Sequence, residues 1–158
     1  MNRRTLFAAG AATLALAACA TTGGGAPSFA TIQAYVADAA ATFDKLVPLI
    51  GEIAPATIAE LQKIQTSADA AAAAFGKLTA PTAAGVAQQV LTYIGDGLAI
   101  VEAVPGLPAP YLAAIAAAQV LLVAISGYFN LGPSASPARV TPAEAAAADA
   151  QLHAFLAS

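Results

Sequence analysis

The sequence predicts an all-α protein, an antiparallel bundle of about four helices followed by a short C-terminal helix. Apolar residues recur at alternating spacings of three and four from residue 28 onward, and no stretch shows the period of two expected of a strand. Hydrophobic residue types make up 59% of the chain, and many of them are alanine, the best helix former. Prolines and glycines divide this pattern into segments of helical length.

The first helix is expected to begin at Ser28, a good N-cap residue, and to extend to about residue 50. Pro48 lies inside its apolar stripe and removes one backbone hydrogen bond. We therefore expect a kink or a short break there, with a turn over residues 51–55. The stripe consists of Phe29, Ile32, Val36, Ala39, Phe43, Leu46 and Ile50.

A second helix is expected over residues 56–78, where the same spacing continues. Two such stripes joined by a short turn predict an antiparallel helical hairpin. Ala68 and the alanines within residues 70–74 would let a neighbouring helix approach closely. The stripe consists of Thr57, Leu61, Ile64, Ala68, Ala71, Phe75 and Leu78.

A third helix is expected over residues 86–104, after a turn at residues 79–82. Gly95 and Gly97 flank Asp96 in its interior, where each glycine costs about 1 kcal/mol relative to alanine. Close packing or a local bend would explain them. The alternative, an anion- or metal-binding turn, is disfavoured because Asp96 has no other oxygen ligands nearby in the sequence.

The fourth helix is expected over residues 111–129, after the proline-rich run 105–110. It contains no charged residue and has aromatic side chains at both ends, and its length is near the minimum for a membrane span. However, Gln119 and Ser126 interrupt it, and no Lys or Arg flanks it. We expect a central bundle helix buried on most sides, with membrane insertion as the alternative.

The last helix has the clearest local signal. After a loop over residues 130–140, Thr141, Pro142 and Glu144 occupy the N-cap, first and third positions of a capping box. A short helix should continue over residues 145–155. The residues expected to dock it on the bundle are Leu152, Phe155 and Leu156.

The first 18 residues have the organisation of an export signal. Arg3 and Arg4 form a positive n-region, and a short apolar run follows. The run is shorter than the about 20 apolar residues of a membrane span, which disfavours a retained anchor. Cleavage to a soluble secreted protein is also disfavoured, because it would leave Cys19, the single cysteine, without a partner in an oxidising compartment.

The end of this segment, Leu16-Ala17-Ala18-Cys19, resembles the lipobox of bacterial lipoprotein precursors. The resemblance covers the signal and this cysteine only. It implies a signal peptide over residues 1–18, acylation of Cys19, by palmitate for example, and a lipidated N-terminus with a flexible tether over residues 19–27. The membrane is then the partner of the chain, through the lipid on Cys19.

Two further details of the N-terminus concern its route and destination. The run Arg3-Arg4-Thr5-Leu6-Phe7 resembles the twin-arginine export signature, and the general secretory route is the alternative. In the lipoprotein sorting of Gram-negative bacteria, an Asp directly after the lipidated cysteine retains the protein in the inner membrane. This chain has Ala20 at that position. By similarity, Ala20 implies the outer membrane, with the domain facing the periplasm. The predicted location is therefore the cell envelope.

The composition of residues 28–158, the alanine-rich bundle domain, limits its partners. Charged residues are 9% of the chain, against roughly 25% in typical soluble domains. Removal of the signal leaves four basic side chains against nine acidic ones, a formal charge of −5. Such a chain has no electrostatic footprint for nucleic acid and no polybasic segment for anionic lipid.

The sequence offers no catalytic, cofactor-binding or metal-binding residues by motif. His153 is the single histidine, has no cysteine or second histidine as a partner, and is expected at the surface. A triad with Ser126 or Ser67 lacks an activating context for either serine. Several acidic residues are scattered along the chain: Glu52, Glu60, Asp69, Asp96 and Glu102. We therefore expect no enzyme and no cofactor.

Three functions remain open. The first is a non-catalytic, lipid-anchored envelope lipoprotein that acts as a structural or interaction module, through self-association or an envelope protein partner. The second is a membrane-inserting envelope or lysis-type protein that uses a helical hairpin near residues 86–129. The third is a module that binds an apolar ligand or a lipid in the bundle interior.

Overall fold

The computed structural model describes residues 27–79, 84–131 and 140–158. The predicted signal peptide, Arg3, Arg4 and Cys19 lie outside these residues, as does the predicted tether up to residue 26. All regular structure in the described residues is helical, which confirms the predicted fold class. The elements are α2 (Phe29–Ile53), the 3-10 turn η3 (Pro55–Thr57), α3 (Ile58–Gly76), α4 (Ala84–Glu102), α5 (Ala109–Tyr128) and α6 (Pro142–Ala157).

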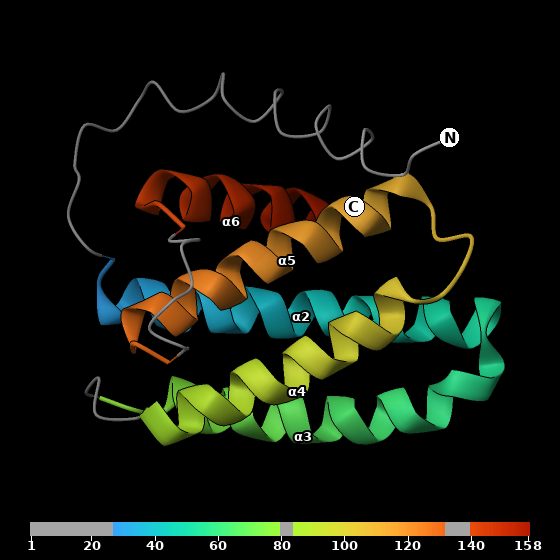
Figure 1. The fold of residues 1–158 in the computed structure, drawn as a ribbon, viewed down its shortest axis with the longest axis horizontal. Coiled ribbons are helices and arrows are strands. Elements are labelled where there is room, and N and C mark those ends of the chain that lie inside the picture. The colour runs from blue at the N-terminus through green and yellow to red at the C-terminus, as the bar shows by residue number, and fades with distance from the viewer. Residues whose placement is uncertain (1–26, 80–83, 132–139) are drawn as a thin grey trace.

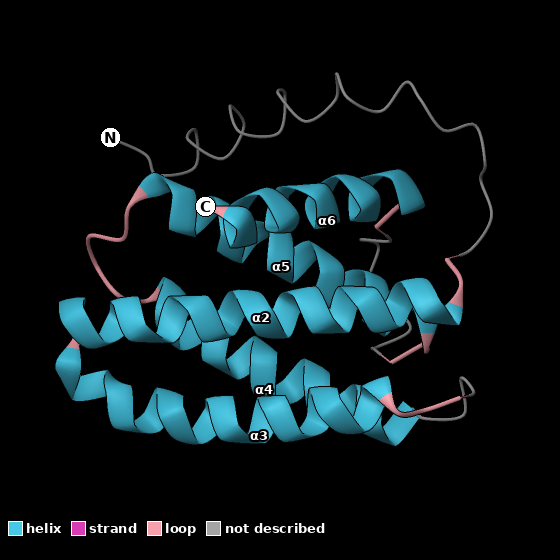
Figure 2. Cartoon of the chain, turned by 180° about the vertical axis from the view of Figure 1, so that it is seen from behind, coloured by secondary structure: helices cyan, strands magenta, loops and turns pink. Residues whose placement is uncertain are grey.

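The helices form two layers. Helices α3, α2 and α6 lie side by side in one layer, with α2 in the middle (Figure 1). Helices α4 and α5 form the other layer, and the reverse view shows them behind the first three (Figure 2). Helix α2 contacts each of the other four helices, so its buried stripe is the centre of the core.

Helix α2 begins at the predicted N-cap, where the Ser28 hydroxyl accepts a hydrogen bond from the Thr31 amide at 3.1 Å. The expected break at Pro48 is wrong, because α2 continues without interruption to Ile53. Pro48 is exposed, and the one backbone hydrogen bond that it removes does not end the helix. Val47 and Ile50 beside it are buried, and their packing keeps this last turn helical.

The predicted α2–α3 hairpin is confirmed. One side chain joins the two helices at the end of the hairpin away from the η3 turn. Nε2 of Gln33 on α2 lies 3.2 Å from the carbonyl of Phe75 and 2.9 Å from that of Leu78, at the end of α3. Because the last carbonyls of a helix have no partner within it, this amide acts as a cap supplied by another helix. It fixes the register of α3 on α2.

The two glycines of α4 differ in their surroundings. A Cβ built on Gly97 would lie 2.3 Å from Cζ of Phe43, whereas a Cβ on Gly95 meets nothing within 4 Å. Asp96 between them is exposed. Close packing therefore explains Gly97 but not Gly95, for which the structure offers no packing reason.

Helix α5 packs against α2, α4 and α6 but is less buried than expected. Only 39% of its most apolar 18-residue window is buried, so the expectation of burial on most sides is wrong. Leu112 and Val123 are 45% and 41% exposed. Among the described residues, α5 is the one helix that is long and apolar enough to cross a membrane.

Helix α6 begins with the predicted capping box. The Thr141 hydroxyl accepts from the Glu144 amide at 3.2 Å, and the Glu144 carboxylate accepts from the Thr141 amide at 2.7 Å. The helix extends to Ala157, two residues beyond the predicted end. Leu152 is fully buried, and Phe155 packs partly buried against the core, as predicted.

Candidate functional site

Helix α6 is held on α2 in a defined register, and this positions the candidate site. Nζ of Lys45 on α2 donates to the carbonyl of Phe155 at 2.7 Å and lies 4.8 Å from the centre of its ring. The ring of Phe155 also packs edge to face against the ring of Tyr111 on α5, with the ring centres 5.6 Å apart. Ala145 and Leu152, which lie two turns apart on α6, are both buried. The side chains of α6 that face α2 are therefore fixed in place.

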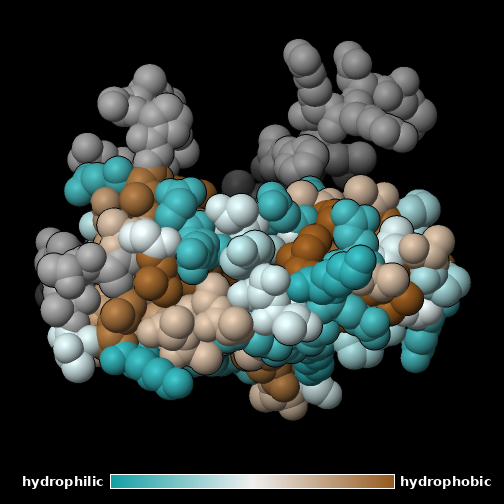
Figure 3. Space-filling view, turned by 90° about the horizontal axis from the view of Figure 1, so that it is seen from below, coloured by the Kyte–Doolittle hydropathy of each residue, from teal (hydrophilic) through white to brown (hydrophobic). Residues whose placement is uncertain are grey.

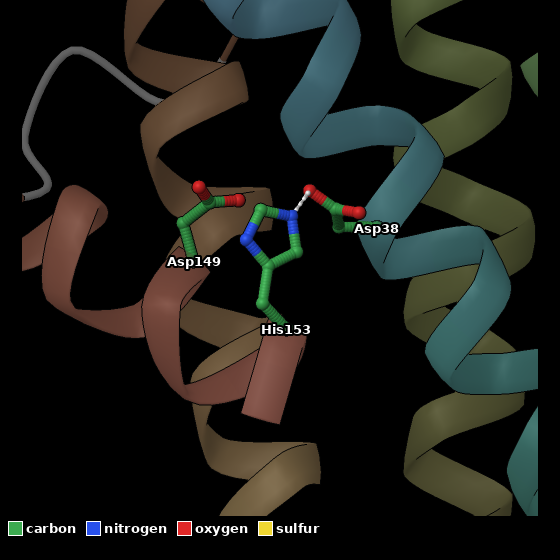
Figure 4. Close-up of side chains that lie close together, drawn as sticks. All are labelled: Asp38, Asp149 and His153. Atoms are coloured by element: carbon green, nitrogen blue, oxygen red, sulfur yellow. Dashed lines mark ion pairs between the residues drawn. The ribbon is translucent and has the colours of Figure 1, made fainter. Parts of the chain in front are cut away.

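The site consists of Asp38 from α2 and of Asp149 and His153 from α6. Nε2 of His153 lies 3.1 Å from Oδ2 of Asp38. Asp149 and His153 are four residues apart, so both project from the same side of α6. Figure 4 shows the imidazole between the two carboxyl groups, and each of the three residues offers a ligand atom within 4.8 Å of the others.

The site lies at the surface but is not fully open. The side chain of His153 is 62% exposed, whereas that of Asp38 is 17% exposed. Oδ1 of Asp149 is buried and has no hydrogen-bond partner among the described residues. One face of the group is thus accessible to solvent, and the opposite face is not.

Burial and the neighbouring acid alter the charge of this group. Burial, and then hydrogen bonding to Asp38 and repulsion from it, raise the pKa of Asp149 to about 6, while the charge of His153 opposes the rise. Burial and then the Asp149 charge also raise the pKa of Tyr35, which lies one turn before Asp38 on α2. The site can therefore hold a proton between two carboxyl groups under mildly acidic conditions.

His153 is exposed, as predicted, but the sequence did not predict that it lies beside Asp38 and Asp149. Neither serine considered for a triad is activated, since Ser126 donates to the Leu131 carbonyl and Ser67 donates to the Lys63 carbonyl at 3.2 Å. Ser67 also lies on α3, across α2 from α6 (Figure 1). The histidine pairs instead with Asp38, which the sequence analysis did not single out.

The scattered acids are all exposed, but Asp69 has an acidic neighbour. Asp69 of α3 lies near Asp44 of α2, which accepts a hydrogen bond from Nε2 of Gln65 at 2.7 Å. Burial and then Asp44 raise the pKa of Asp69. Glu102 accepts from Nε2 of Gln119 at 2.9 Å. The exposed acids are Glu52, Glu60, Asp69, Asp96 and Glu102.

The described part of the chain is thus an all-α helical bundle with a histidine and two aspartates grouped between α2 and α6. Comparison with protein-family models, with curated protein sequences and with solved structures finds no match to this chain.

Proposed function

We propose that this protein is a non-catalytic cell-envelope lipoprotein, anchored through acyl chains on Cys19 in the outer membrane, with its bundle facing the periplasm. The observation that carries the proposal is the order of features along the chain. A basic n-region, a short apolar run and Leu16-Ala17-Ala18-Cys19 come first, and helix α2 begins at Phe29, soon after. A folded module thus follows directly on a segment organised as a lipid anchor.

The surface of the bundle supports an interaction role. The face that Figure 3 shows has hydrophobic residues in separate groups among hydrophilic ones. Helix α5 leaves Leu112 and Val123 substantially exposed. With so few charged residues, apolar contact is the main attraction that this surface offers, and a second copy or an envelope protein is the expected partner.

Intact-mass analysis of the membrane fraction tests the anchor. We expect a mature species that begins at Cys19 and carries diacylglyceryl and acyl mass, and we expect Cys19→Ala to lose it, while Thr22→Ala as a neighbouring control keeps it. A native protein with its N-terminus intact, or cleaved without added lipid, would overturn the proposal. In a Gram-negative host, Ala20→Asp should also move the protein to the inner-membrane fraction of a density gradient.

A membrane-inserting hairpin near residues 86–129 is the second candidate, and the exposed apolar face of α5 favours it. In the described structure α4 and α5 pack against the other helices, so insertion would require them to separate from α2. The Cys19→Ala protein distinguishes the candidates by size-exclusion chromatography. A soluble oligomer supports the interaction module, and dependence on detergent supports insertion.

An apolar-ligand module remains a third hypothesis. A hollow of about 280 Å³ lies between α4 and α5, and Leu91, Leu122 and Val123 contribute to its lining. Sites for drug-sized ligands usually measure about 300–1,000 Å³ and enclose most of the ligand. Because this hollow is small and open, a soluble monomer that retains lipid through purification would be needed to favour this hypothesis.

A further inference from the structure

We propose that Asp38, Asp149 and His153 form a binding site for one divalent transition-metal ion, of which zinc is the best fit, and that the ion joins α6 to α2. The site does not depend on the lipid anchor. It also differs from what the sequence suggested, since no motif in the chain predicted a metal ligand.

The donor set favours this class of ion. One imidazole nitrogen and two carboxylate oxygens suit zinc and its neighbours, whereas calcium and magnesium take oxygen ligands. Two ligands four residues apart on one helix, together with a third from a facing helix, make a compact three-point site. Three protein ligands leave a further position for water.

The distances fit an ion of this size. Bonds of about 2.1 Å in tetrahedral geometry place ligand atoms roughly 3.4 Å apart. Nε2 of His153 and Oδ2 of Asp38 are already 3.1 Å apart, and all three ligand atoms lie within 4.8 Å of one another. The three ligand atoms are therefore close to the separation that one bound ion requires.

The buried carboxylate oxygen points to a missing partner. Oδ1 of Asp149 is inaccessible to solvent and accepts no hydrogen bond from the described residues. Buried polar atoms are nearly always paired, and an unpaired carboxylate oxygen is especially unfavourable. A metal ion bound through this oxygen, together with Asp38 and His153, would supply the missing interaction.

The charge of the site also favours a cation. Within residues 27–79, 84–131 and 140–158, no lysine lies within ion-pair distance of Asp38 or Asp149. Lys45, the lysine that contacts α6, directs its ammonium group to the carbonyls of Phe155 and Leu156. A divalent ion would therefore offset two carboxylate charges, and the exposed imidazole gives it access from solvent.

The single histidine permits a direct test by NMR. The probe is zinc chloride, added to the full chain in a mild detergent, with Cys19→Ser to remove the only thiol and without a histidine tag. Since His153 is the only imidazole, its ring signals report the site alone. We expect them to shift and to saturate at one zinc per chain, while the thermal midpoint rises. Magnesium and calcium should leave both readouts unchanged.

Variants separate this site from zinc held by the histidine alone. Asp38→Asn and Asp149→Asn should each lower zinc affinity on the order of tenfold or more, since both carboxylates ligate the ion. Asp96→Asn, which removes an exposed acid on α4, is the matched control and should bind as the parent does. Ring signals that stay unshifted in excess zinc would overturn the proposal. Equal affinity in the two aspartate variants and the control would also overturn it.

Discussion

Gly97 of α4 lies directly against the ring of Phe43 of α2, so closely that a single added methyl group would come within 2.3 Å of Cζ. Both residues are buried, and Phe43 is fully inaccessible. The ring occupies the space that a side chain at position 97 would need. This contact explains why a helix tolerates glycine at an interior position, and it sets how closely α4 approaches α2.

The glycine pair in α4 gives the first prediction. Gly97→Ala should destabilise the protein by about 1–3 kcal/mol, because the added Cβ would overlap the fully buried ring of Phe43. Gly95→Ala should stabilise it by about 0.5–1 kcal/mol, because its Cβ meets nothing and alanine favours the helix. Urea unfolding followed by circular dichroism measures both. Equal effects of the two substitutions would contradict the packing explanation for Gly97.

The capping box of α6 gives the second prediction. Thr141→Ala should cost about 1 kcal/mol, because the Glu144 amide loses its acceptor. Thr66→Ala, which removes an exposed hydroxyl from the interior of α3, is the control and should cost little or nothing. A Thr66→Ala protein as unstable as Thr141→Ala would indicate that the loss does not come from the cap.

The same capping box should make α6 sensitive to acid. The amide and then the hydroxyl of Thr141 donate to Glu144 and hold the pKa of its carboxyl below the usual value. The resulting stability is present above the ordinary glutamate pKa of about 4.3 and is lost as the pH falls through the lower pKa of the folded state. Thermal midpoints of Glu144→Gln and the parent should therefore converge at low pH. A constant difference would contradict this mechanism.

The Asp44–Asp69 pair gives the opposite pH dependence. Burial and then Asp44 raise the pKa of Asp69, so folding favours its protonated form. The associated stability is present below the ordinary aspartate pKa of about 3.9 and is lost as the pH rises through the raised value. Asp69→Asn should therefore raise the thermal midpoint at neutral pH and lose this advantage in acid. In an Asp44→Asn background the gain should shrink, and an unchanged gain would exclude Asp44 as a cause.

The attachment of α6 gives the last prediction. Lys45→Met keeps the aliphatic stem but removes the donor to the Phe155 carbonyl, and we expect a loss of about 1–2 kcal/mol. Hydrogen exchange should accelerate in α6 more than in α3, because the lost contact joins α6 to α2 and does not involve α3. Lys63→Met, at an exposed position on α3, is the control. Uniform acceleration across all helices would show that α6 does not open separately.

Only part of the candidate site could be predicted from the sequence. The four-residue spacing of Asp149 and His153 is visible in the chain and would have placed both on one side of a helix. Asp38 could not be paired with them, because more than a hundred residues separate it from α6 and no motif links the two. The raised pKa of Asp149 depends on burial against α2, which no local pattern encodes.

The sequence by itself determined the helical class, the start of α2 at Ser28, the capping box at Thr141 and most of the buried stripes. These follow from interactions between residues within a few positions of one another, which the order of residue types records directly. Only the tertiary structure decided that α2 continues through Pro48, that Gly97 and not Gly95 packs closely, and that α5 keeps an exposed face. Those outcomes depend on contacts between distant segments, whose packing outweighs local preference.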